Sequence, residues 1–297
     1  MYNCIFIQLA VQKKYNFAKE GICMKKIFLI FAFFLQVINC CSQKISPDYD
    51  YRNIGSAKKL SGKTYVLVLF VSYKYAQDWT KEEMDEIYQK IFNAFSWLKK
   101  SAKKYNSEVD FSLFVLGDNE KIKMDYIPQG PFEGAYSTEM LKLAMYEADY
   151  DKKFDFEEYA HQTIGSDNCV VYVCCNTYGR SFALPVSLNF FDYYKKNGSN
   201  RDLLEGCVLY KGFDTLRPLY SSVIAHETLH LFGAADLYDV YGGDDSVLDK
   251  KMQRYFPTSI MRRTPYDIED AEVDKLTAFL VGISSSYESR FDEFLNQ

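Results

Sequence analysis

The chain has few histidines, tryptophans and prolines. Of its 297 residues, three are histidine, two are tryptophan and seven are proline. The formal net charge is −5, and no stretch combines dense lysine and arginine with a known recognition motif, which argues against nucleic acid as a partner. No Cys-x-x-Cys pair is present, so the cysteines give no zinc or redox motif.

The remaining composition is that of a globular chain. Hydrophobic residues make up 48% of the sequence and charged residues 25%, which argues against intrinsic disorder. A chain of this length can bury the core of one large domain or of two modest ones. The 25 tyrosines and 23 phenylalanines are attributed to packing, with the lining of a substrate cleft as the alternative.

An export signal is predicted near the N-terminus. Lys25 and Lys26 precede an apolar run, Ile27–Ile38, that is short for a transmembrane helix. The cysteines that follow, Cys40 and Cys41, resemble those of a bacterial lipoprotein signal, in which a cysteine becomes the lipidated first residue. We therefore expect a lipid anchor at Cys40, with Cys41 as the alternative because Cys40 lacks the usual small residue before it.

These features divide the chain into four parts. Residues 1–23 are an over-called extension ahead of a true start at Met24, or else a genuine tail. Residues 24–40 are the lipoprotein-type signal, and residues 41–62 are a polar tether. Residues 63–297 form the folded domain. The protein is expected at the outer membrane, in the periplasm or at the cell surface, or otherwise to be secreted, and to act as a monomer.

An α/β (α+β) fold is predicted, with a twisted mixed sheet backed by a long helix. Between Thr80 and Lys104 apolar residues recur every three or four positions, and Thr80 followed by Glu83 has the pattern of a capping box. Pro185 indicates that its run is an edge strand or a loop. Strands are expected at Lys63–Lys74, Val109–Leu116, Asn168–Asn176 and Ser181–Asn189, and further helices at Ser137–Ala148, Phe154–Thr163, from Pro218 onward and at Asp267–Ile283.

Four cysteines lie within this domain: Cys169, Cys174, Cys175 and Cys207. They allow two disulfides, but the strand-like surroundings of the first three fit buried free thiols equally well. Cys174 and Cys175 point to opposite faces of an extended strand, so at most one of them could readily meet Cys207.

The most informative segment runs from residue 226 to residue 236 and has the pattern HExxHxxGxxD. On a helix advancing about 100° per residue, His226 and His230 lie about 40° apart on one face, so both imidazoles can reach one metal ion. Glu227 is offset from them and can accept a proton from a metal-bound water. A pair of core histidines is the alternative, and the required glycine and aspartate argue against it.

Asp236 can become a third ligand only if the helix stops. On a continuing helix it would lie about 9 Å along the axis from His230, away from the metal. Gly233 is the residue that can take a positive φ and end the helix, which lets the chain turn back beneath the metal. A carboxylate is a normal zinc ligand, and three protein ligands leave a fourth position open for water.

This segment resembles the zinc motif of the metzincins, in the variant with aspartate as third ligand. It is similar to snapalysin-like and to immune inhibitor A-type bacterial metalloproteases. Metzincins also carry a Met-turn downstream, and Met261 in Thr258–Arg263 matches it. The resemblance implies a buried active-site helix and, after it, a small C-terminal subdomain with the Met-turn and a terminal helix.

The resemblance further implies a zinc endopeptidase acting on a protein or peptide substrate. Zinc held by His226, His230 and Asp236 would activate a water, and Glu227 would be the general base. The tyrosine that some metzincins place two residues after the methionine is Arg263 here. The group that stabilises the oxyanion therefore stays open among Tyr238, Tyr241, Arg262, Arg263 and Tyr266.

Several alternatives remain open at this point. Glu269 and Glu272 could replace Asp236 as third ligand, as in gluzincin-type peptidases. The acidic stretch Leu237–Lys250 could bind calcium, although it lacks the EF-hand spacing. His161 is expected to be structural or at the surface. An extended substrate could add to an edge strand at Ser181–Asn189 or at Gly206–Tyr210.

The competing function is that of an inactive relative. Such a protein would keep the metzincin fold and hold a peptide or glycan at the cell surface without cleaving it. Intact candidate ligands and an intact glutamate favour the enzyme, because an inactive descendant would be expected to lose these first.

Overall fold

A computed structural model describes residues 55–118, 121–125, 127, 137–148, 160–185, 204–238 and 246–295. The predicted extension, the signal segment and the cysteines Cys40 and Cys41 lie outside the described residues. In the described part of the chain, no helix is both long enough and apolar enough to span a membrane.

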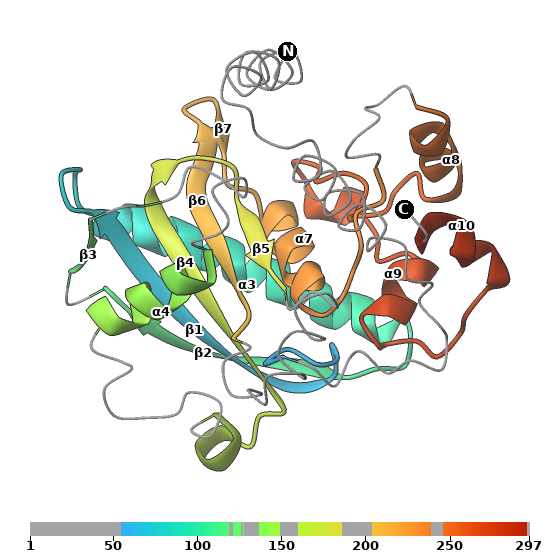
Figure 1. Ribbon diagram of the computed structural model, residues 1–297, viewed down its shortest axis with the longest axis horizontal. Helices are drawn as coiled ribbons and strands as arrows, with labels where there is room; N and C mark the ends of the chain where they lie inside the picture. The colour runs from blue at the N-terminus through green and yellow to red at the C-terminus, as the bar shows by residue number, and fades with distance from the viewer. Residues whose placement is uncertain are drawn as a thin grey trace, which may run out of the picture. The chain divides into compact units, whose positions relative to one another are not determined.

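A mixed sheet forms the centre of the domain (Figure 1). Its strand order is β2-β1-β4-β6-β5, with β3 added beside β1 and β7 beside β6. Strands β1 to β4 and β6 run parallel, whereas β5 and β7 pair antiparallel with β6. The strands are β1 (Gly62–Tyr73), β2 (Val109–Leu116), β3 (Ile122–Met124), β4 (Asn168–Tyr178), β5 (Phe182–Leu184), β6 (Gly206–Asp214) and β7 (Arg217–Pro218).

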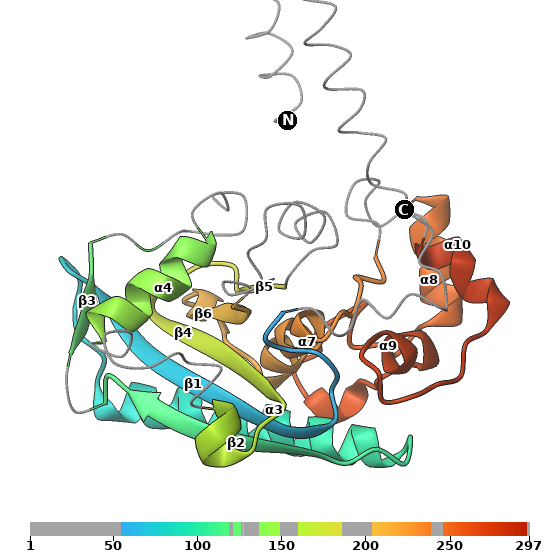
Figure 2. The ribbon, with the colours of Figure 1, turned by 60° about the horizontal axis from the view of Figure 1, so that its bottom comes forward.

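Both faces of this sheet are buried. Along β1, Val66 and Val68 belong to one apolar cluster and Leu67 and Leu69 to the other, as the alternation of side chains in a strand requires. Helices α3 (Lys81–Lys103) and α7 (Ser221–Leu231) cover the first face, and α4 (Ser137–Glu147) covers the second (Figure 2). The mixed α/β class predicted from the sequence is confirmed.

The long backing helix is also confirmed, and its start is defined by local chemistry. Thr80 accepts a hydrogen bond from the Glu83 N–H, and the Glu83 carboxylate accepts one from the Thr80 N–H. This capping box satisfies two N–H groups that the first turn leaves unpaired. The buried face of α3 includes Ile87, Ile91 and Leu98, as its periodicity predicts.

The predicted terminal helix Asp267–Ile283 is wrong as a single element. The structure has a short 3-10 turn, η4 (Ile268–Asp270), and a separate helix α9 (Lys275–Leu280). Between them the chain is extended, and Glu272 forms an isolated parallel bridge with Ser259. Asp274 then begins α9 as its N-cap, because its carboxylate accepts the N–H groups of Leu276 and Thr277. The remaining C-terminal elements are α8 (Val247–Tyr255), η5 (Ser289–Phe291) and α10 (Asp292–Leu295).

Three boundaries also differ from those predicted. Ser56, Ala57 and Leu60 are buried, and the Ala57 N–H donates to Glu205 at 2.7 Å, so the end of the expected tether 41–62 belongs to the domain. Pro218 lies in β7, and α7 begins at Ser221. Within the predicted helix Phe154–Thr163, the described part is a π-helical turn, η3 (Ala160–Ile164).

The four cysteines of the domain are buried free thiols. Cys174 and Cys207 lie in the cluster beneath α3 and α7, and Cys169 and Cys175 lie in the opposite cluster. The prediction that Cys174 and Cys175 face opposite ways is therefore confirmed. Burial raises the pKa of Cys175 and of Cys207 well above the usual range, so these thiols stay protonated and inert.

Candidate metal centre

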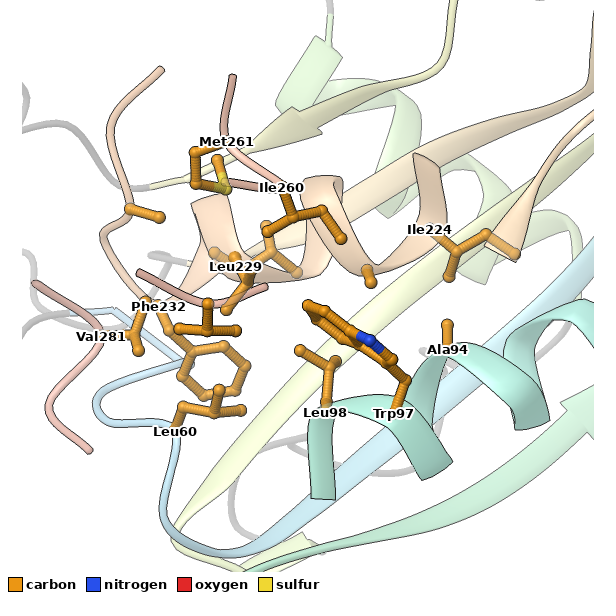
Figure 3. Packing of buried hydrophobic residues seen from close by; sticks show 14 of the residues in the cluster. Leu60, Ala94, Trp97, Leu98, Ile224, Leu229, Phe232, Ile260, Met261 and Val281 are labelled. Carbon is orange, nitrogen blue, oxygen red and sulfur yellow. The ribbon is translucent and has the colours of Figure 1, made fainter. Parts of the chain in front are cut away.

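Helix α7 carries the two histidines and is held in place at several points. Thr228, one turn from Ile224, donates to the Ile224 carbonyl at 2.6 Å and is hydrogen-bonded to the Tyr172 hydroxyl of β4 at 2.5 Å. Both side chains are fully buried. In Figure 3, Leu229 of α7 lies between Trp97 of α3 and the turn that carries Met261. The helix is thus fixed to the sheet on one side and to the C-terminal segment on the other.

The helix ends where the sequence predicts. Gly233 has φ 97°, a conformation that residues with a Cβ rarely adopt. The Gly233 N–H donates to the His230 carbonyl and the Ala234 N–H to the Leu229 carbonyl, both at 3.0 Å. This closed turn sends the chain back toward the histidines and brings Asp236 to them.

Three side-chain atoms converge at the end of α7. The Nε2 atoms of His226 and His230 are 3.1 Å apart. Asp236 Oδ1 lies 3.4 Å from His226 Nε2 and 3.2 Å from His230 Nε2. His226, Glu227 and His230 also present ligand atoms within 4.8 Å of one another. The sequence-predicted ligands His226, His230 and Asp236 are therefore brought together, and Glu227 lies beside the two imidazoles.

The hydrogen bonds of the imidazoles set the chemistry of this cluster. His226 Nδ1 lies 2.9 Å from the Ile260 carbonyl, and His230 Nδ1 lies 2.8 Å from the Ala234 carbonyl. A carbonyl only accepts, so each Nδ1 carries the hydrogen and each neutral imidazole directs its Nε2 lone pair into the cluster. Asp236 Oδ1, a third acceptor, is buried there without a hydrogen-bond partner. In this arrangement three lone pairs face one point, which a cation could occupy.

The spacing of the three atoms fits a zinc ion. Tetrahedral zinc with ligands at about 2.0–2.1 Å separates neighbouring ligand atoms by about 3.3–3.4 Å. The observed separations are 3.1, 3.2 and 3.4 Å. Two imidazole nitrogens and one carboxylate oxygen are also a normal donor set for zinc, and the carbonyl partners on Nδ1 fix each ring as they do in metal sites.

The ionisable groups of the cluster shift one another's pKa values. Burial lowers the pKa of His230, but the neighbouring Asp236 carboxylate outweighs this effect, and the pKa is raised. Burial raises the pKa of Asp236, whereas the two neighbouring imidazoles hold it well below the usual range. Asp236 is therefore a carboxylate at any ordinary pH and can offer an anionic oxygen to a cation.

Glu227 is buried beside the cluster. Burial raises its pKa, while the nearby imidazoles and a hydrogen bond from the Ala183 N–H of β5 act in the opposite direction. A carboxyl group with a raised pKa can both accept and return a proton near neutral pH. The N–H of an edge strand thus holds the side chain that the sequence predicts as the base.

The turn around Met261 lies against the cluster. The Ile260 carbonyl is the partner of His226, and the Met261 carbonyl accepts the Leu237 N–H at 2.9 Å. Met261 is fully buried. Asp274, which no motif indicated, accepts the Ser259 hydroxyl at 2.6 Å, and Ser259 Oγ accepts the Met261 N–H at 3.1 Å. Asp274 therefore holds the turn and, through it, the orientation of His226.

A cavity of about 490 Å³ opens beside His226 and Glu227. Tyr238 lines it, and its hydroxyl is hydrogen-bonded to the Asp236 carboxylate. Burial, followed by the charge of Asp236, raises the pKa of Tyr238 to about 12, so the hydroxyl stays protonated. Arg180, 3.5 Å from that hydroxyl, also lines the cavity and was missed because it comes from the β4–β5 connection, remote in sequence.

The other candidates for oxyanion stabilisation and for the third ligand lie in different surroundings. Arg262 and Arg263 line the cavity, whereas Tyr266 lines a separate hollow and stacks edge-on against Tyr220. Tyr241 lies outside the described residues. Glu269 is exposed and pairs with Lys100 at 2.5 Å, and exposed Glu272 accepts the Thr258 hydroxyl.

The remaining predictions concern calcium, His161 and the substrate edge. Within the acidic stretch proposed for calcium, residues 239–245 lie outside the described residues, and Asp249, which is described, is buried within α8. His161 is exposed, as expected of a surface residue. Gly206–Tyr210 cannot serve as a free edge, since β6 is paired with β4 on one side and with β5 on the other.

Comparison with known proteins adds no assignment. No protein-family model matches the chain, and none of the curated proteins matches it.

Proposed function

We propose that this chain is a zinc-dependent endopeptidase of metzincin-like architecture. The observation that carries the proposal is the convergence of His226 Nε2, His230 Nε2 and Asp236 Oδ1 within 3.4 Å, with Glu227 beside them at the wall of a cavity. A pair of ordinary core histidines would not direct three lone pairs at one point. The turn at Gly233 and the buried Met261 further support the resemblance.

His226, His230 and Asp236 would hold the metal. A zinc ion bound there supplies Lewis acidity and makes a water acidic enough to attack a peptide carbonyl near neutral pH. The Ile260 and Ala234 carbonyls keep the two imidazoles in the tautomer that ligation needs.

Glu227 moves the proton. It accepts the proton released by the attacking water and delivers it to the leaving amine nitrogen as the C–N bond breaks. Its raised pKa suits both steps, and the Ala183 N–H fixes the carboxylate in place. Burial in the cavity wall keeps bulk water away from the carboxylate during the transfer.

Tyr238 is the hydroxyl best placed to assist. It is protonated, lines the cavity and is hydrogen-bonded to Asp236. From there its O–H can donate to the oxygen of the tetrahedral intermediate. Arg262 and Arg263 line the same cavity. Their role is in binding the substrate.

The substrate adds to the sheet at β5. In the described part of the chain, β5 is the last strand of the sheet order, and its Ala183 N–H already reaches Glu227. An extended peptide running along this edge passes Glu227 and the cavity. The predicted substrate is therefore an unstructured or extended stretch of polypeptide.

Metal analysis and a cleavage assay test the proposal together. We expect the purified protein to contain about one zinc per chain, and to cleave a peptide library in a reaction that a chelator stops and added zinc restores. A protein that binds zinc stoichiometrically but cleaves nothing would be the inactive surface binder. Cleavage that continues without metal would contradict the mechanism.

A further inference from the structure

The cavity beside Glu227 has an unusual charge. Five segments line it: the β4–β5 connection, the β6–β7 hairpin with the residues that follow it, α7, Tyr238 and the stretch after Met261. Three of them contribute arginine. Among the described residues the lining has four arginines, Arg180, Arg217, Arg262 and Arg263, and one acidic residue, Glu227. This concentration is local, because the whole chain has a formal net charge of −5.

The protein itself neutralises only part of this charge. Arg217 is paired with Asp214 on the hairpin. Arg262, with a side chain 17% exposed, approaches buried Asp249 only to 3.8 Å, and its Nε is buried without a hydrogen-bond partner. A buried guanidinium N–H left in this state costs free energy unless a ligand or solvent group completes it.

The other two arginines have no acidic partner among the described residues. Arg180 contacts the neutral hydroxyl of Tyr238 at 3.5 Å. Exposed Arg263 lines the cavity two residues after Met261. Two cations therefore remain available to a ligand that enters the cavity. Apolar surface from Phe213 and Val223 lies beside them and can cover the methylene groups of a side chain.

We propose that this cavity is a specificity pocket for a carboxylate, and that the substrate carries aspartate or glutamate next to the cleaved bond. His226 and Glu227 line the same cavity, so a side chain held by Arg180 and Arg263 lies adjacent to the reacting carbonyl. Arginine binds carboxylates through paired N–H donors, which a neutral glutamine cannot match. The inference that this bond is cleaved rests on the proposed function, but selective binding of the carboxylate does not.

Binding to an inactive protein tests the pocket without relying on catalysis. Glu227→Gln is used with fluorescent peptides, capped at both ends, that differ only in glutamate or glutamine at one position. Moving that position along the peptide identifies the subsite. We expect the best glutamate peptide to bind about three- to tenfold more tightly than its glutamine partner, a preference that weakens as salt is raised. Equal binding at every position would overturn the proposal.

A charge reversal identifies the residue responsible. In the same inactive background, Arg263→Glu should abolish or invert the preference for glutamate. Arg254→Glu makes the same charge change on the exposed face of α8, outside the lining of the cavity, and should preserve the preference. If both variants reduce it equally, only the overall charge of the protein matters and the pocket is not the cause.

A free peptide end is the second source of a carboxylate. Glutamine peptides with a free C-terminal carboxylate are therefore compared with their amidated forms. Tight binding of the free end alone, with no preference for an internal glutamate, would contradict the pocket as proposed. If wild-type protein cleaves peptides without preference, the pocket is wrong and the proposed function stands. If it cleaves nothing but binds glutamate peptides selectively through Arg263, the pocket is supported and the proposed function is wrong.

Discussion

At the scale of a single residue, Asp236 is the side chain that contacts both histidines and Tyr238. Its carboxylate lies against both imidazoles, accepts the Tyr238 hydroxyl and remains ionised because the histidines hold its pKa low. Its position depends on the turn at Gly233, since a continuing helix would carry it away.

The choice of third ligand can be tested directly. Asp236→Ala should lower zinc affinity by a large factor, because it removes one of three protein ligands. Glu269→Ala and Glu272→Ala should keep stoichiometric zinc, since both carboxylates are exposed and bonded elsewhere. Zinc content after dialysis against a weak chelator measures all three. Retention in the Asp236 variant with loss in either glutamate variant would remove the metzincin assignment.

Tyr238 gives a second prediction at this scale. Tyr238→Phe should lower kcat by about tenfold to a hundredfold with little change in KM, because the lost donor acts mainly on the transition state. Tyr266→Phe is the matched control: its ring is exposed and lies outside the cavity. An equal loss of kcat in both variants would show that Tyr238 has no special role.

At the scale of elements, one buried pair of hydroxyls joins α7 to the sheet. Tyr172 of β4 and Thr228 of α7 share a hydrogen bond of 2.5 Å in a fully buried setting. Removing the Thr228 hydroxyl takes this partner from the buried Tyr172 hydroxyl, whereas Thr228 keeps its bond to the Ile224 carbonyl when the Tyr172 hydroxyl is removed. Removing both hydroxyls leaves an apolar contact.

This difference can be measured as a double-mutant cycle. Thr228→Val alone should reduce the free energy of unfolding by about 1–3 kcal/mol, and Tyr172→Phe alone by about 1 kcal/mol, because Thr228 keeps its bond to Ile224. The double variant should lose less than the sum of the two. Denaturant unfolding of the metal-free proteins gives the values. Strict additivity would mean that the two side chains do not interact.

The elements that the sequence predicted well are those determined by nearby residues. Helix α3 follows from its apolar spacing and the Thr80–Glu83 capping box. His226, Glu227 and His230 lie together because one helical turn brings them together. The segment 267–283 was misjudged because its apolar spacing continues across a break. That break is made by Asp274, which caps α9 and also binds Ser259.

The parts of the site that the sequence did not predict depend on contacts between residues far apart in the chain. Asp274, Arg180 and the Ala183 N–H reach the site from three separate parts of the chain. A local pattern could have suggested only the first, since aspartate is a preferred N-cap residue. The charge of the cavity is likewise a property of the fold, because its arginines come from three segments that the topology brings together.

At the scale of the whole molecule, we propose that the N-terminal segment sets the location of the protein. If Cys40 is lipidated, the domain is tethered to a membrane surface, and Cys40→Ala should move the protein from the membrane fraction to the soluble fraction of expressing cells. A shift seen only with Cys41→Ala would transfer the anchor to that residue. A wild-type protein that is already soluble and unlipidated would remove the lipoprotein prediction.

We propose that a metal held by His226, His230 and Asp236 serves peptide hydrolysis with Glu227 as the base. The most direct measurement compares peptide cleavage by the wild type and by Glu227→Gln at equal zinc content. Because Glu227 is not proposed as a ligand, both proteins should bind about one zinc per chain, and the variant should cleave at least about a hundredfold more slowly. Cleavage at the wild-type rate by a zinc-loaded Glu227→Gln protein would contradict the role of Glu227 as the base.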